Sequence, residues 1–330
     1  MQNNIRSTRA IVETGLMAAI IMVFMIIRTY IPFVEVIAFF LLPVPITLTY
    51  IRHGLKYAIA SLVISTILGI MFINPMIVIV ISVTCGLVGL TLGYCVYKNR
   101  EFSFTLMLLS FAFAIGIIIN MVILTTFIYK GGFIAFINTQ VKVIQESINM
   151  AGNVYSSLGV NKQQIDVVLS PYKMFTTDFV LKLLPATLVA AAVIYAFLSY
   201  VITKAVFKKL RIEMAKAIPF TKLYIPTIFS ALMILAIGLG MFLSSRKLSA
   251  GDYIIYSSYT LFTLILTIIG ASAAAYFLMY RYKMKKGAVT SIIIMVLLIL
   301  PILLIYLGVA ETIFDFRKID PNRPRRKLED

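Results

Sequence analysis

The sequence predicts an all-α protein, a polytopic transmembrane helical bundle of about nine spans with a cytoplasmic N-terminus. Two observations lead to this fold class. Mean hydropathy is +0.99, and 61% of the residues are apolar while only 13% are charged. In addition, apolar runs of about 20 residues, the length that crosses a bilayer, alternate with short Lys/Arg clusters. A soluble core of 330 residues does not need so much apolar surface, so the solvent is a bilayer.

Nine apolar stretches are candidates for spans. We expect them at 10–29, 34–51, 55–73, 76–97, 103–129, 179–203, 223–244, 253–280 and 287–309. The second is the weakest, because it carries Glu35 and the Pro43-Val44-Pro45 break. It is therefore either a complete span or a short, bent or re-entrant helix.

Basic clusters set the orientation of the chain. They are Arg6/Arg9, Arg52/Lys56, Lys98/Arg100, the group from Lys204 to Lys222, and the group from Arg281 to Lys286. All five fall on one side if every span crosses, and Lys/Arg excess marks the cytoplasmic side. The composition, rich in Ile, Lys and Asn, is associated with low-GC bacteria, so we expect a bacterial plasma membrane.

The C-terminal tail conflicts with nine crossings. Nine crossings place it outside, whereas Arg323, Arg325, Arg326 and Lys327 would favour the inside. Eight crossings, with span two or span nine not traversing, are the alternative.

The chain divides into four segments by composition. We expect a six-span bundle at 1–203, a basic cytoplasmic loop at 204–222, three further spans at 223–310 and a charged tail at 311–330. Within the first, 130–177 reads as amphipathic helix outside the membrane. It is either a helical hairpin on the outer membrane surface or a lid over an outward-opening cavity.

The motifs of most intramembrane enzymes are missing. His53 is the single histidine, and it lies in a cytoplasmic turn. Zinc proteases and Ser/His proteases need histidines elsewhere, and no phosphate-binding loop occurs. We therefore expect no enzyme, no cofactor and no metal. The net charge of +17 sits beside apolar runs, which favours lipid headgroups and excludes nucleic acid as a partner.

Five polar residues near the outer ends of spans are candidates for binding a solute, because polar groups inside a membrane are costly. They are Arg28, Glu35, Asn120, Asp178 and Lys182. Asp178 and Lys182 stand four residues apart and share a helix face. If all five converge, they line an outward-facing pocket.

Each candidate also has a simpler explanation. Arg28 and Lys182 would then snorkel to the interface, Asp178 would stabilise a helix N-terminus, and Asn120 would bond to a neighbouring helix. Separately, Gly15 and Ala19 on span one have the small-residue spacing that allows a partner helix to pack closely.

The chain resembles the YybS-like family of polytopic membrane proteins from Gram-positive bacteria. The residues that carry the resemblance are Arg9 to Ala19, Pro43-Val44-Pro45-Ile46, Arg52-His53-Gly54-Leu55 and Asp315-Phe316-Arg317-Lys318. The resemblance covers essentially the whole chain and implies no particular activity.

The first six spans also resemble the substrate-binding (S) component of energy-coupling-factor transporters. In that family small residues on the first helix, here Gly15 and Ala19, dock the membrane coupling subunit. The substrate pocket opens outward beneath loops that correspond here to 28–34, 74–75 and 130–177. This chain departs from the family in its longer fifth loop, its three additional spans and its lack of recognisable vitamin-binding residues.

These observations support two hypotheses. The first is a transporter-like protein that binds a small solute in an outward-facing pocket and relies on separate ATPase subunits for energy. The alternative is a membrane scaffold or regulator that acts through protein partners.

Overall fold

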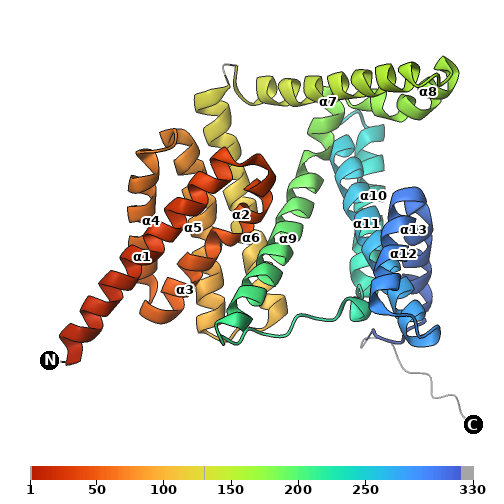
Figure 1. The fold of residues 1–330 in the computed structure, drawn as a ribbon. Coiled ribbons are helices and arrows are strands. Elements are labelled where there is room, and N and C mark those ends of the chain that lie inside the picture. Colours follow the sequence, from red (N-terminus) through yellow and green to blue (C-terminus); the bar gives the residue numbers. More distant parts are fainter. Residues whose placement is uncertain (1, 130, 321–330) are drawn as a thin grey trace, which may run out of the picture. The chain divides into compact units, whose positions relative to one another are not determined.

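The computed structural model describes residues 2–129 and 131–320, and every regular element in these ranges is a helix (Figure 1). The α-helices are α1 (Gln2–Tyr30), α2 (Glu35–Leu41), α3 (Pro43–His53), α4 (Leu55–Ile70), α5 (Pro75–Tyr97), α6 (Phe102–Ile123), α7 (Gly132–Ser157), α8 (Lys162–Leu169), α9 (Thr177–Lys209), α10 (Thr227–Ser245), α11 (Ser249–Tyr276), α12 (Lys286–Ile299) and α13 (Pro301–Phe314). Short 3-10 turns precede α2 (Pro32–Val34), follow α8 (Ser170–Met174) and lie in the loop before α10 (Phe220–Lys222). Single π-turns extend α6 (Leu124–Ile128) and α11 (Phe277–Arg281).

The predicted fold class is confirmed. Seven helical segments are long and apolar enough to cross a membrane, and α12 with α13 makes an eighth if the bent pair is one span. The seven are Thr8–Tyr30, Pro32–His53, Pro75–Tyr97, Phe102–Phe127, Thr177–Lys209, Thr227–Ser245 and Ser249–Arg281. The remaining predicted span corresponds to α4, an apolar helix of 16 residues.

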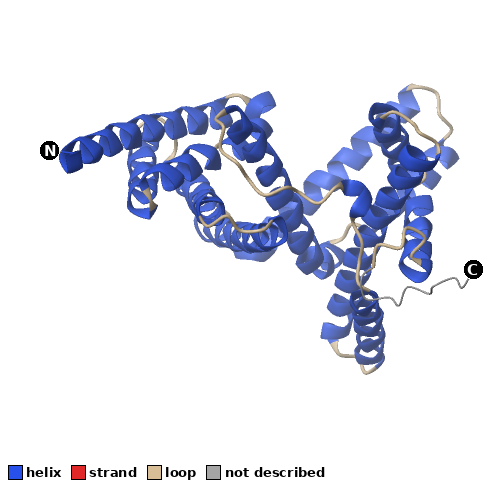
Figure 2. Cartoon of the chain, turned by 90° about the horizontal axis from the view of Figure 1, so that it is seen from below, coloured by secondary structure: helices blue, strands red, loops and turns tan. Residues whose placement is uncertain are grey.

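The chain forms two compact units, and each is described here by itself. The first comprises 1–173 and 188–216, and the second comprises 174–187 and 217–330. Helix α9 contributes its first turns to the second unit and its remainder to the first. The segment limits expected at 203, 222 and 310 stay predictions. Between α9 and α10 the chain runs through the long loop 210–226, shown in Figure 2.

The core of the first unit lies where α1, α4 and α5 meet α3. Ile21, Met25, Ile46 and Val78 are fully buried there. The predicted weak second span consists of α2 and α3, with Leu42 between them. Pro32–His53 as a whole is long and apolar enough to count as one span, and Thr47 Oγ1 donates to the Pro43 carbonyl oxygen at 2.9 Å. This stretch passes through the core as a helical segment that is interrupted by a turn at Leu42.

Small residues bring α3 against α5. A Cβ atom added to Gly89 would lie 2.8 Å from Ile46 Cβ, and one added to Gly93 would lie 2.6 Å from Tyr50 Cβ. Real Cβ atoms do not approach so closely, so these two positions require glycine. Close backbone approach of this kind is a main source of helix association in lipid.

Helices α7 and α8 form a hairpin that turns at Gly159, whose φ of +79° favours glycine. Gly152 of α7 faces Leu169 and Ile165 of α8. This hairpin occupies most of the predicted amphipathic segment 130–177, of which residue 130 lies outside the described residues. Its location on the membrane surface, or as a lid, stays a prediction.

In the second unit, α10 and α11 form an antiparallel hairpin. Ser244, near the end of α10, donates to Asp252, near the start of α11, at 2.8 Å. Gly270 of α11 and Gly308 of α13 pack backbone on backbone. An added Cβ would clash with the carbonyl of Leu304 at Gly270 and with the carbonyl of Leu266 at Gly308.

The predicted ninth span at 287–309 is not one straight helix. It breaks at Leu300, where φ is −141°, and α13 turns from α12 by 110°. Pro301 causes the break, because proline lacks the N–H that would continue the helix. Each half has 14 residues and rises about 21 Å, which is shorter than the hydrocarbon core of about 30 Å.

A buried ion pair holds the end of this hairpin. Arg317 Nε donates to Glu311 Oε1 at 2.7 Å, and the side-chain exposures are 0% and 5%. The guanidinium also donates to the carbonyl oxygens of Thr221 and Leu223 at 2.8 Å, and to Ser272 Oγ at 2.7 Å. Four groups from three separate parts of the chain therefore converge on the Arg317 side chain.

These contacts place both ends of the α12–α13 pair at the same end of the second unit. α12 begins directly after α11, while Arg317 contacts the loop that leads into α10. Because α10 and α11 are antiparallel, the start of α10 and the end of α11 lie together. The pair therefore enters and leaves at one end of the unit, as a re-entrant hairpin does, which favours the predicted alternative in which span nine does not traverse. The basic tail residues after 320 lie outside the described residues.

This geometry predicts the sidedness of the chain. In a background of Cys85→Ala and Cys95→Ala, we expect Lys285→Cys and Lys318→Cys to be shielded from a membrane-impermeant maleimide in intact cells. Asn74→Cys, in the turn before α5, should react. All three positions are exposed on the protein. Labelling of Lys318→Cys from outside would contradict the re-entrant hairpin.

Removing Arg317 should destabilise the second unit. Arg317→Met leaves Glu311 buried without its cation, and breaking a buried pair in this way costs about 3–5 kcal/mol. Thermal unfolding in detergent measures the loss, with exposed Lys318→Met as the control. Adding Glu311→Gln to Arg317→Met should recover part of the loss, and failure to do so would contradict the assigned pairing.

Candidate functional site

Three of the five predicted residues line one cavity of the first unit. The cavity has a volume of about 330 Å³. Its walls are formed by Arg28, Glu35, Val36, Phe39, Phe40, Thr84, Phe113, Ile117, Asn120 and Tyr195. Arg28, Glu35 and Asn120 thus line one cavity, and their role in binding a solute stays a prediction. Asp178 and Lys182 are not among the residues that line it.

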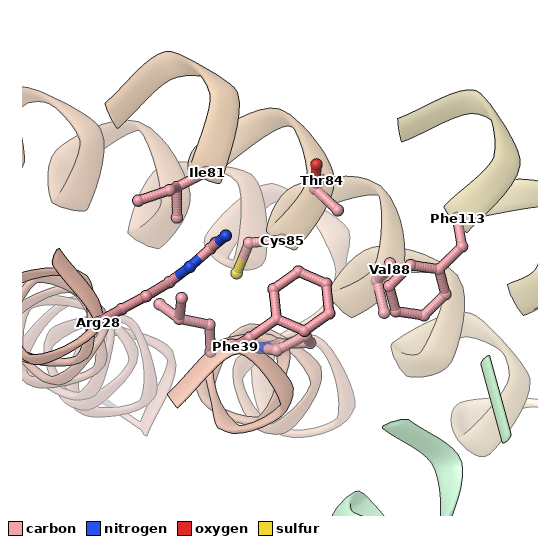
Figure 3. A pocket seen from close by; sticks show the side chains of 9 residues that line it. Arg28, Phe39, Ile81, Thr84, Cys85, Val88 and Phe113 are labelled. Atoms are coloured by element: carbon pink, nitrogen blue, oxygen red, sulfur yellow. The ribbon is translucent and has the colours of Figure 1, made fainter. Parts of the chain in front are cut away.

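Arg28 occupies the last turn of α1. Its guanidinium lies over the Phe39 ring, 4.9 Å from the centroid. Figure 3 shows the side chain extended from α1 towards Ile81 and Cys85 of α5, beside a small hollow that shares Arg28, Phe39, Thr84 and Phe113 with the cavity. No hydrogen bond or ion pair joins Arg28 to another described residue, so its N–H groups retain their donor capacity.

Asn120 contributes an acceptor that is equally unused. Its Nδ2 donates to Thr84 Oγ1 at 2.7 Å, and Thr84 Oγ1 in turn donates to the Val80 carbonyl at 3.3 Å. Because the hydroxyl proton is already committed, Thr84 needs a donor from Asn120, which fixes the orientation of the amide. Asn120 Oδ1 is then buried without a partner among the described residues.

One glycine makes the bond between Asn120 and Thr84 geometrically accessible. Gly116, one turn before Asn120 on α6, faces Thr84, and a Cβ atom there would lie 3.3 Å from Thr84 Cγ2. The absence of that atom lets α6 approach α5 closely. The predicted alternative for Asn120, a bond to a neighbouring helix, is therefore correct for its amide nitrogen but not for its oxygen.

Four aromatic rings form one wall. Phe39 lies 4.9 Å from Phe40 and 5.7 Å from Tyr195, and Phe113 lies 6.0 Å from Tyr195, centroid to centroid. These pairs are edge-to-face, an arrangement that leaves ring faces available for a further planar group. Sequence reasoning missed these rings, because a chain with 23 Phe and 18 Tyr gives no local signal for the few that meet.

Glu35 is the first residue of α2, where a carboxylate is favoured by the partial positive charge of the helix N-terminus. It is exposed and forms no ion pair with a described residue. The lining of the cavity therefore includes one cation and one anion, Arg28 and Glu35, which interact electrostatically, on a mostly apolar surface.

Asp178 and Lys182 belong to the second unit and form the predicted pair. Lys182 Nζ lies 2.7 Å from Asp178 Oδ2 and 2.9 Å from Asp252 Oδ2. Asp252 also accepts a hydrogen bond from Ser244 Oγ. Sequence reasoning missed Asp252, whose signal was a carboxylate at the start of an apolar span. A role of Asp178 and Lys182 in binding a solute stays a prediction.

The opposite end of the first unit carries a second set of charges. Glu13 lies 2.9 Å from Arg9 Nε and 2.8 Å from His53 Nε2, and 3.5 Å from Arg52. The single histidine of the chain thus takes part in a charge cluster with Glu13, Arg9 and Arg52. Cys85 and Cys95 are both buried and free.

Gly15 and Ala19 lie on an exposed side of α1. A Cβ atom added to Gly15 would meet nothing within 4 Å. No contact among the described residues therefore explains why position 15 is a glycine.

These observations define a polytopic helical membrane protein with an open, mostly apolar cavity that is lined by aromatic side chains and a few polar ones. Residues 19–315 match the model of the family described as predicted membrane protein (DUF2232), and the chain belongs to that family. It is 27% identical to the uncharacterized protein YybS of Bacillus subtilis (strain 168) over 225 residues, which are 67% of this chain and 69% of that protein. The predicted YybS-like relationship is confirmed.

No solved structure matches the chain. The resemblance of its first six spans to the S component of energy-coupling-factor transporters stays a prediction.

The Lys182 cluster gives a test of stability that is independent of any ligand. Asp252 is 35% exposed and bonds both Lys182 and Ser244, whereas Asp178 is 71% exposed and bonds Lys182. We expect Asp252→Asn to lower the melting temperature in detergent more than Asp178→Asn does. Equal effects, or the reverse order, would contradict the view that Asp252 connects α9, α10 and α11.

Proposed function

We propose that this membrane protein captures a small solute in the cavity of its first unit. The observation that carries the proposal is that Arg28, whose N–H groups have no hydrogen-bond or ion-pair partner among the described residues, lines the same cavity as Glu35 and Asn120. Polar groups within a bilayer are costly unless they are paired, and ionisable ones usually mark a site of function. A bound solute supplies the missing partners.

The cavity opens on the outer side in this proposal. Arg28 lies at the end of α1, and the Glu13 cluster lies near its start, beside Arg9, Arg52 and His53. Basic residues mark the cytoplasmic side, so the opposite end of α1 faces outward. The membrane is then the bacterial plasma membrane, as the Bacillus relative supports.

Energy, if uptake is active, comes from separate subunits, and the chain itself is not an enzyme. The exposed Gly15 and Ala19 on α1 support a helix of such a subunit as their partner, since small residues admit a closely packed helix. A scaffold or regulator is the competing function, and it requires no occupant of the cavity.

Purification from the native host in mild detergent, followed by mass spectrometry of small molecules and proteins, tests the proposal. We expect one metabolite in stoichiometric amount with the wild type, and its loss from Arg28→Met and Asn120→Leu. Arg100→Met is the matched control, because Arg100 also lies over a phenylalanine ring, 5.2 Å from the Phe104 centroid, but outside the cavity. Recovery of protein partners with no metabolite in any sample would favour the scaffold.

A further inference from the structure

We propose that α7 lies in the membrane surface at the end of α6 and buries one apolar face among the lipid headgroups and the upper acyl chains. The partner of this face is the bilayer itself, rather than another protein or the cavity of the first unit. The inference goes beyond the proposed function, since it holds whether or not the cavity binds a solute. It selects one of the two locations that the sequence left open for the segment 130–177.

Helix α7 begins where a span ends. The apolar segment Phe102–Phe127 is long enough to cross the membrane, and α7 starts soon after it, at Gly132. Between them, Gly131 and Gly132 adopt φ values of +114° and +72°, which favour glycine and let the chain turn sharply. Figure 1 shows α7 running across the end of α6 instead of continuing it. The first turn of α7 therefore lies at the level of the membrane surface.

The composition of α7 fits a helix that lies in this surface. It has 26 residues, yet it is not among the described helices that are apolar enough to cross a membrane. Lys142, Glu146, Asn149 and Asn153 follow one another at intervals of three or four residues and form a polar face. Helices with one polar and one apolar face bind at the boundary between headgroups and acyl chains.

The charge of α7 indicates which lipids it needs. Lys142 and Glu146 are the only charged residues of the helix, and they form an exposed ion pair at 3.9 Å. α7 thus carries no net charge, and its attachment depends on apolar contact and not on attraction to anionic lipids. A phosphatidylcholine bilayer is therefore sufficient to bind it.

One contact with the end of α6 shows which face of α7 is directed at the membrane. The Phe136 ring lies 5.0 Å from the ring of Tyr129, the residue that follows the π-turn of α6. Tyrosine is enriched at the membrane–water interface. Val143, Met150 and Val154 follow Phe136 at about two, four and five helical turns, so they share its face. This face, the apolar stripe of α7, therefore continues from the end of the span.

No described part of the chain covers the apolar stripe. The side chains of Val143, Met150 and Val154 are 53–61% exposed. Helix α8 packs on another face of α7, because Gly152, which faces Leu169 of α8, precedes Val154 by two residues and so points nearly the opposite way. An uncovered apolar stripe that starts at the membrane surface finds its partner in the lipid.

Fluorescence quenching tests this location in phosphatidylcholine nanodiscs that hold one copy of the protein each. In the background that lacks both native cysteines, Met150→Cys and Val154→Cys carry an NBD fluorophore on the stripe. Lys142→Cys and Asn153→Cys carry it on the polar face and are the matched controls, and all four positions are exposed. We expect blue-shifted emission from the stripe labels, quenched by lipids with a nitroxide near the headgroup. Aqueous iodide should quench the control labels instead.

Three outcomes would overturn the proposal. If iodide quenches the stripe and control labels equally, the stripe faces water. If the stripe labels are blue-shifted but no nitroxide lipid quenches them, the chain itself covers the stripe, as a lid would. If nitroxides at the ends of the acyl chains quench more strongly than those near the headgroup, α7 inserts deeply and does not lie in the surface. The metabolite experiment decides the proposed function separately.

Discussion

Polar groups inside a bilayer have no water to pair with, and this constraint determines which parts of the molecule are structural and which are available for function. Arg317 meets it completely, with a carboxylate, two carbonyls and a hydroxyl. Lys182 meets it with two carboxylates. Arg28 and Asn120 do not meet it with described residues alone. Arg317 thus joins parts of the second unit through its hydrogen bonds, whereas Arg28 keeps hydrogen-bond donors available for another partner.

Glycine has a corresponding role in the apolar parts of the chain. Lipid tails are as apolar as leucine, so helices associate in a membrane through close packing rather than through exclusion of water. Gly89 and Gly93 allow α3 to pack closely against α5, and Gly270 and Gly308 allow α11 to pack closely against α13. Gly116 connects packing to the site, because the close approach that it permits is what allows Asn120 to reach Thr84.

The sequence was sufficient for features that depend on local composition. The apolar spans and the pairing of Asp178 with Lys182 both follow from residue type and helical spacing. The re-entrant hairpin was only one of several alternatives, although Pro301 was its signal. The aromatic wall, Asp252 and the contacts of Arg317 with Thr221 and Leu223 could not be predicted, because they join residues that are far apart in sequence and their partners are set by packing.

The break at Leu300 and Pro301 has a consequence for how the protein is made. A last helix that crosses outward must carry the residues after it through the membrane, and each arginine or lysine among them opposes that transfer. Because α12 and α13 begin and end at the same end of the second unit, Arg317 and Lys318 stay on the side from which α12 enters. The last insertion step then requires no transfer of these two cations across the bilayer.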